Sequence, residues 1–122
     1  MKRKNITTEE AIKLIIDEKE LVNVNINGNL ILDNRIEGKN VRMDNAFING
    51  NLGILTTIKT LYMPNTSVMG NIDLLFAEIQ LSIDFRRTKF DALYADGAIA
   101  LAIHMSIQSK MVTSPSKLFS LV

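Results

Sequence analysis

The chain has 122 residues, of which 47% are hydrophobic and 22% are charged, and its formal net charge is +1. This is the size of one domain, and a domain of this length can bury a hydrophobic core without disulfides or metals. The sequence contains no cysteine, which excludes disulfide frameworks and thiolate zinc sites. A net charge near zero weighs against a nucleic-acid-binding protein with a broad basic face, and equally against an acidic mimic of DNA.

The first predicted element is a helix over residues 7–20. Thr7 and Glu10 have the spacing of a capping box, in which each side chain accepts a hydrogen bond from a backbone N–H of the first turn. Ala11 and Ile15 recur at helical spacing and belong to one apolar face. We expect this helix to cover the open end of the structure that follows it.

The sequence shows no targeting or membrane signal. Basic residues follow Met1, but Glu9 and Glu10 come soon after, without the long apolar stretch of a signal peptide. The longest apolar segment, around residues 98–103, is too short to span a bilayer. We therefore expect a soluble cytoplasmic protein without membrane contact, in which residues 2–4 form a frayed terminus.

Beyond residue 20 the sequence repeats itself. Asparagine, glycine and β-branched residues become frequent, which favours short strands and tight turns. A similar phrase begins at Ile26, at Ile48 and at Val68, in steps of 22 and 20 residues. Large apolar residues arrive about every five residues, a period that is neither 3.6 nor 2. This rhythm predicts a chain that turns a corner every five residues and stacks its coils about 4.8 Å apart.

Four columns of apolar residues are predicted to fill the interior. They are Ile26, Ile48, Val68 and Phe90; Leu32, Ile54, Leu74 and Tyr94; Ile36, Ile58, Ile79 and Ile99; and the pairs Val41/Met43, Leu61/Met63, Leu81/Ile83 and Leu101/Ile103. An aspartate at an interior position would be an unpaired buried charge. Leu81→Asp is therefore expected to unfold the chain, and Ser82→Asp to be mild.

Small residues and asparagines recur in the same frame. Small residues precede the large ones at Ala46, Thr66 and Thr88 and at Thr56, Ala77 and Gly97. Asparagines recur at Asn29, Asn51 and Asn71 and at Asn25, Asn45 and Asn65. Close packing favours one large and one small side chain on a narrow face, and asparagine suits corners and stacked ladders.

The predicted fold is all-β: a right-handed quadrilateral β-helix of about four coils with an N-terminal capping helix. Residues 1–122 form a single domain. Residues 21–107 make the coils, and residues 108–122 either cover the last coil or mediate dimerisation.

Two families resemble this chain. Residues 43–54 (MDNAFINGNLGI) and 95–98 (ADGA) resemble the phrasing of pentapeptide-repeat proteins, which implies a right-handed β-helix over residues 21–107. Some members of that family inhibit DNA gyrase by resembling DNA in shape and negative charge, but this chain is not acidic. Residues 61–72 (LYMPNTSVMGNI) are similar to bactofilins, β-helices that form polymers, although bactofilins do not usually open with a capped helix.

The sequence predicts no catalytic, cofactor or metal site. His104 is the single imidazole, and as a general base or metal ligand it would need a partner that no motif supplies, so we interpret it as an outward residue beside Ile103. The aspartates do not recur at matched column positions, which indicates solvated corners. Glycines at 28, 50 and 70 lack the lysine of a phosphate loop and are interpreted as turns.

Two segments are candidate interaction sites. Arg86, Arg87 and Lys89 form the densest internal basic patch, interpreted either as a contact for an anion or a protein partner or as a solvated bulge before Phe90. The C-terminal segment contains large apolar residues that need burial. They include Leu118, Phe119 and Leu121. We expect a homodimer through this end of the chain.

The sequence is compatible with two main classes of function. The first is a non-enzymatic protein-protein interaction or scaffold module with an unknown protein partner. The second is a self-assembling structural protein, because the open end of a β-helix is a strand edge that invites pairing. Inhibition of a nucleic-acid enzyme such as DNA gyrase is a third and weaker alternative.

Overall fold

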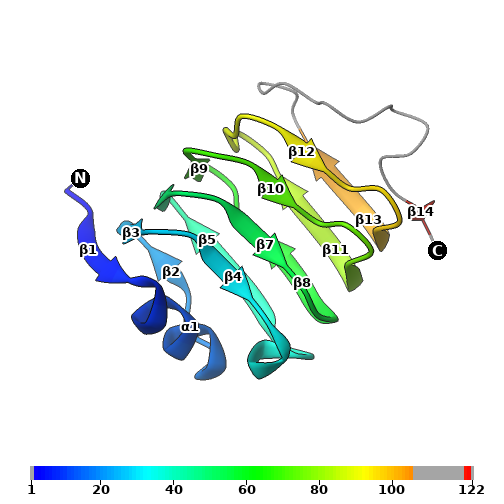
Figure 1. The fold of residues 1–122 in the computed structure, drawn as a ribbon, viewed down its shortest axis with the longest axis horizontal. Coiled ribbons are helices and arrows are strands. Elements are labelled where there is room, and N and C mark those ends of the chain that lie inside the picture. The colour runs from blue at the N-terminus through cyan, green and yellow to red at the C-terminus, as the bar shows by residue number, and fades with distance from the viewer. Residues whose placement is uncertain (1, 106–119, 122) are drawn as a thin grey trace.

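The computed structural model describes residues 2–105 and 120–121, and Figure 1 shows their strands stacked along one axis. Neighbouring strands run parallel and the chain cycles among three sheets, so successive coils add equivalent strands. One helix lies at the start of the stack. The predicted all-β solenoid with an N-terminal capping helix is confirmed.

Each sheet forms one side of the solenoid. The first sheet contains β1 (Lys4–Thr7), β3 (Val24–Asn27), β6 (Phe47–Asn49) and β9 (Ser67–Val68). The second contains β4 (Leu30–Leu32), β7 (Leu52–Ile54), β10 (Ile72–Asp73) and β12 (Leu93–Tyr94). The third contains β2 (Leu21–Val22), β5 (Asn40–Asp44), β8 (Ile58–Tyr62), β11 (Glu78–Phe85), β13 (Ile99–Met105) and β14 (Ser120–Leu121). A 3-10 helix, η1 (Asn34–Ile36), connects the second and third sheets in the first coil.

The prediction that the N-terminal residues form a frayed terminus is wrong for Arg3 and Lys4. Strand β1 pairs in parallel with β3, with Lys4 opposite Val24, and the side chains of Asn5 and Asn25 are hydrogen-bonded at 3.1 Å. Arg3 donates from its Nε to the backbone oxygen of Asn45 at 2.9 Å. The edge of β3 offers free backbone groups to the preceding chain, which satisfies them by adding a strand before the helix.

Helix α1 (Thr8–Ile16) is shorter than the predicted range of 7–20. Thr7 caps it, and the predicted capping box with Glu10 is present. The helix ends at Asp17 because Glu18 adopts a left-handed backbone conformation, with φ of 57°. Its buried face includes Ile15 and contacts η1 and strands of the first two coils, so it covers the open end as expected.

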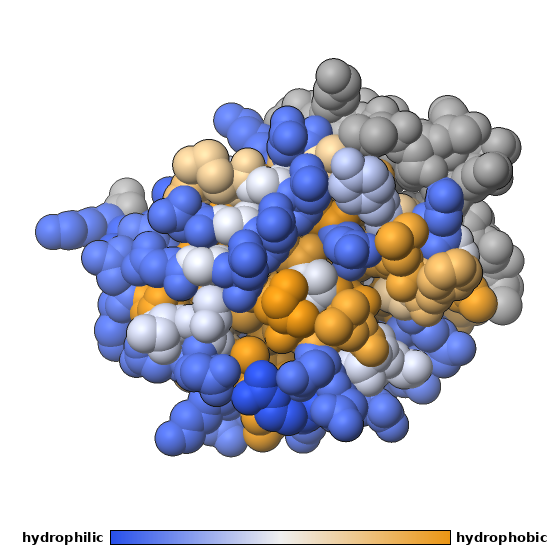
Figure 2. All heavy atoms as spheres, viewed as in Figure 1, coloured by the Kyte–Doolittle hydropathy of each residue, from blue (hydrophilic) through white to orange (hydrophobic). Residues whose placement is uncertain are grey.

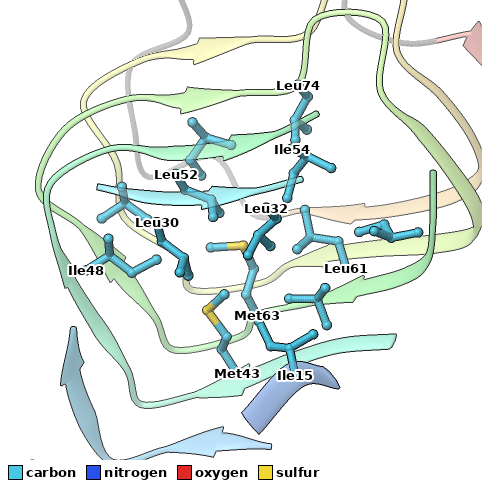
Figure 3. Close-up of a cluster of buried hydrophobic side chains, with 14 of the residues drawn as sticks. Ile15, Leu30, Leu32, Met43, Ile48, Leu52, Ile54, Leu61, Met63 and Leu74 are labelled. Carbon is cyan, nitrogen blue, oxygen red and sulfur yellow. The ribbon is translucent and has the colours of Figure 1, made fainter. Parts of the chain in front are cut away.

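Stacked side chains fill the interior over the first three coils (Figure 3). Leu30 and Leu52 lie in one column, Leu32 and Ile54 in the next, and all four are fully buried. Figure 3 shows Ile15 of the helix reaching into the same cluster as Met43. The cap and the coils therefore share one continuous hydrophobic core.

The predicted interior position of Leu81 is wrong. Leu81 is 47% exposed and Leu101 is 50% exposed, whereas Ile83 is fully buried and lies opposite Leu61. The cause is a register shift between Ile79 and Ser82 in β11, where the chain carries one residue more than β8. The extra residue shifts the later pairing, so Ile83 takes the interior place predicted for Leu81, and the predicted step of 20 from Leu61 fails here.

Two predicted columns also fail at their last members, Ile99 and Tyr94. Ile99 lies opposite Glu78, and Ala100 takes the place opposite Ile79. Tyr94 lies opposite Asp73 on the outer face and is 36% exposed, while Ala95 is fully buried. Alanines therefore occupy several interior positions in this part of the solenoid, alongside Leu93.

The corner asparagines follow a different series from the one predicted. The equivalent residues are Asn23, Asn45, Asn65 and Arg87, all in the left-handed region with φ of 50–55°. The side-chain amide of Asn45 donates to Asn23 at 2.7 Å, and Asn25 belongs to a neighbouring position opposite Phe47. Asparagine tolerates this conformation better than most residues do, which explains its recurrence.

Candidate interaction surface

Arg86, the first of the predicted interaction residues, is paired with Asp84. Its Nη2 lies 2.7 Å from Asp84 Oδ2 and its Nε lies 3.0 Å from Oδ1. Asp84 is only 6% exposed, and the hydrogen bonds to its carboxylate raise the pKa of the Arg86 guanidinium above the ordinary value. The ion pair compensates a buried carboxylate, so Arg86 has a structural role at the wall of the solenoid.

Arg87 and Lys89 lie at the next corner. Arg87 donates from its Nε to Asn65 Oδ1 at 2.6 Å, in the corner series described above. Lys89 is exposed and continues the first sheet through a bridge to Ser67. The bulge expected at this patch lies instead in β11, between Ile79 and Ser82. The guanidinium groups of Arg86 and Arg87 bind different acceptors of the same chain.

His104 lies in β13, and the parallel register places its backbone opposite Asp84. The sequence did not reveal this neighbour, because the irregular β11 obscured the pairing. Of the predicted C-terminal contact residues, Leu118 and Phe119 lie outside the described residues. Leu121 belongs to β14, which pairs with Ala100 at the outer edge of β13.

A surface that the sequence did not reveal lies on the outer side of the second sheet. We call it the apolar strip and define it as Ile31, Leu55, Leu75, Phe76 and Tyr94. Phe76 is 81% exposed and Leu55 is 66% exposed, and the other three are at least 36% exposed. Figure 2 shows apolar side chains gathered on this side of the solenoid with hydrophilic residues around them. These residues are scattered in the sequence, and only the stacking of coils brings them together.

Two shallow hollows flank Leu55. The first, of about 230 Å³, lies among Ile31, Leu55 and Tyr94, where Gly53 interrupts the outward column of side chains. The second, of about 320 Å³, is lined by Leu55, Leu75 and Phe76. The strip is thus a grooved apolar surface on a rigid sheet.

Phe76 has an unusual backbone conformation for an aromatic residue. Its φ is 58°, in the left-handed region, which costs a residue with a side chain roughly 1–2 kcal/mol. The next coil has Gly97 at the equivalent corner, with φ of 77°, and the Phe76 ring packs over this glycine. Glycine at position 76 would avoid this strain, so the backbone conformation does not explain the phenylalanine.

The charged residues that line the two hollows are acidic. Asp73 lines the first hollow and is fixed by accepting a hydrogen bond from the backbone N–H of Leu75 at 3.0 Å. Glu78 lines the second, together with Thr56, whose hydroxyl donates to Glu37 at 3.4 Å. No lysine, arginine or histidine is among the described residues that line either hollow.

Within residues 2–105 and 120–121, no three histidine, aspartate or glutamate side chains form a group that could hold a metal ion. The α-helix of this region, with nine residues, is too short to cross a bilayer. Comparison with known proteins gave no match: no family model fits the chain, and neither a curated protein nor a solved structure is significantly similar to it.

Proposed function

We propose that this chain is a non-enzymatic interaction or scaffold module, of the pentapeptide-repeat-like kind, that binds an unidentified protein through an outer face. The observation that carries this proposal is the apolar strip, with Leu55 and Phe76 exposed at 66% and 81% on a rigid frame. Clusters of exposed apolar side chains are typical of protein interaction sites.

The solenoid interior is filled with side chains, so a partner would have to bind to the outer surface. Its large side chains, such as Ile54 and Leu52, are fully buried within one contiguous core. Close packing leaves a partner only the outside of such a frame. In this proposal Arg86, Arg87 and Lys89 form a secondary contact, although the guanidinium groups of the first two already bind oxygens of the chain itself.

A bactofilin-like self-assembling protein is the alternative, in which strand edges at the end of the stack would pair between copies. Ser120 and Leu121 lie opposite Ile99 and Ala100, which is a parallel strand added at the C-terminal end of the third sheet. A second copy would have to pair with the outer edge of β14 or with the part of β13 beyond Ala100. In the self-assembling alternative, the chain forms a homodimer through its C-terminal end. The interaction module is proposed to be cytoplasmic. Inhibition of a nucleic-acid enzyme is weaker, because the net charge of +1 does not resemble DNA.

Two measurements test the proposal. Sedimentation over a range of concentrations should give a constant mass for an interaction module, whereas growth into polymers would favour the alternative. The second measurement is affinity capture from native lysate with the variant Leu55→Ser/Leu75→Ser. Its matched control is Leu81→Ser/Leu101→Ser, which removes comparably exposed leucines from the third sheet.

We expect the strip variant to lose proteins that the control variant and the unmodified chain retain. Because all four leucines are at least 45% exposed, neither pair of substitutions should unfold the solenoid. If the strip variant captured the same proteins as the control, the strip would not be the binding surface.

A further inference from the structure

On the basis of the interaction function proposed above, we propose that the apolar strip binds a protein segment whose large apolar side chains are flanked by lysine or arginine. Phe76 is its anchor residue. Three features of the described chain lead to this partner chemistry: the backbone strain at Phe76, the paired hollows beside Leu55, and the sign of the surrounding charge.

Phe76 occupies a corner whose backbone conformation disfavours it. The left-handed conformation suits the glycine that stands at the equivalent position of the next coil, Gly97. Phe76 is 81% exposed, so its ring adds little to the buried core, and its backbone conformation is strained. Aromatic residues are enriched among those that dominate binding energy at interfaces. The geometry therefore points to contact between the Phe76 ring and a partner.

The two hollows indicate more than one apolar side chain on the partner. Gly53 opens the first hollow, because a Cβ at this position would lie 3.2 Å from Ile31 Cδ1 and narrow the space. Leu55 lines both hollows, and Phe76 borders the second. A segment crossing the strip can place one side chain on either side of Leu55.

The charges identify the flanks of that segment. Asp73 and Glu78 line the two hollows, and the described lining residues include no cation. Complementary charges across an interface raise the association rate and select among partners. Lysine or arginine next to the apolar side chains would lie near Asp73 and Glu78, whereas aspartate or glutamate there would be repelled.

Fluorescence anisotropy with two synthetic peptides tests this partner chemistry. Both carry the same spaced leucines, and one is flanked by lysines and the other by glutamates. We expect the lysine peptide to bind, and Phe76→Gly to weaken its binding by at least about tenfold. Glycine adopts the left-handed conformation without steric strain, so this variant should remain folded. The control Leu81→Gly removes an exposed side chain of the third sheet and should bind as the unmodified chain does.

A second variant tests the charge. Asp73→Asn/Glu78→Gln keeps the shape of both side chains, and it should weaken binding of the lysine peptide and reduce its dependence on salt. Unchanged binding by Phe76→Gly, or equal binding of the two peptides, would overturn the proposal. Failure of the lysine peptide to bind would overturn it as well. The broader interaction function is decided separately, by capture with the Leu55/Leu75 variant.

Discussion

Gly70 stands where the side chain of any other residue would collide with the coil below. Its Cβ would overlap Oδ1 of Asn51, and a Cβ at Gly50 would lie 2.6 Å from the backbone oxygen of Gly28. Asn51 uses that same Oδ1 to accept a hydrogen bond from the backbone N–H of Asn71 at 2.8 Å. The repeated Gly-Asn pair thus has a steric cause: the glycine makes room for the asparagine ladder. Gly50 and Gly70 need no left-handed angle, unlike Gly28 with φ of 116°.

A double-mutant cycle tests this coupling. Gly70→Ala should destabilise the chain by about 1–3 kcal/mol, as overpacking does. In the background of Asn51→Ala the obstructing amide is gone, so the same substitution should cost clearly less. Urea denaturation of the four proteins gives the coupling energy. Additive costs would mean that the ladder amide does not impose the glycine.

Whereas Gly70→Ala should destabilise the chain, Phe76→Gly should not. Replacement by glycine removes the left-handed strain, so the free energy of unfolding should rise by up to about 1 kcal/mol or stay unchanged, despite the loss of contact with Gly97. Phe76→Ala retains a Cβ and gains none of this relief, which makes it the matched control. A marked loss of stability in both variants would show that the ring supports the fold.

At the scale of single elements, β11 decides which leucines and isoleucines form the core. Ile83→Asp should reduce the free energy of unfolding by more than about 4 kcal/mol, because it buries an unpaired charge. Leu81→Asp, at a position that is 47% exposed, should change it by about 0.5 kcal/mol or less. Chemical denaturation measures both. Similar losses for the two variants would contradict the register of β11 against β8.

The same strand shows where the sequence is informative and where it is not. In the first three coils the steps of 20 and 22 residues align Ile26 with Ile48 and Leu30 with Leu52, as the structure does. In β11 the residues 79, 81 and 83 are all apolar, so alternation is compatible with either register. The long step before Phe90 indicates an extra residue, but the sequence does not show that it lies between Ile79 and Ser82. The apolar strip was not predicted for another reason: Leu55, Leu75 and Phe76 lie outside the predicted columns, and only the stacking of coils brings them together.

Helix α1 offers a test of the cap that was predicted from sequence. Thr7→Ala should cost about 1 kcal/mol, because Thr7 Oγ1 accepts from the backbone N–H of Glu10 at 3.0 Å. Thermal melting at neutral pH measures this loss. An unchanged melting temperature would mean that the fold does not depend on the capping box.

Glu10 should make the stability of the helix depend on pH. Its pKa lies below the ordinary value of 4.5, mainly because its carboxylate accepts a hydrogen bond from the backbone N–H of Thr7. Since the folded pKa is the lower one, the contribution of Glu10 is complete above pH 4.5 and is lost as the pH falls through the folded pKa. Thermal melting of Glu10→Gln, which cannot titrate, should show a smaller acid dependence than the unmodified chain.

At the scale of the whole molecule, the two ends of the stack differ. The first end has a helix packed on a core of large side chains such as Ile15 and Leu32, all fully buried. Towards the other end the buried positions include Ala95, Ala98 and Ala100. A solenoid is stabilised coil by coil, through contacts between neighbours, and each buried methylene contributes about 0.8 kcal/mol. Stability should therefore fall along the chain.

Hydrogen exchange measured by mass spectrometry tests this gradient. Amides of β12 and the start of β13 should exchange faster than those of β7 and β8, because local opening follows the density of apolar contacts. The concentration dependence of the exchange adds a test of assembly. If protection of β13 rises with protein concentration, a second copy covers this end and the self-assembling function gains support. Protection that is uniform along the stack at every concentration would mean that the coils open together, and that the alanine-rich interior does not weaken its end.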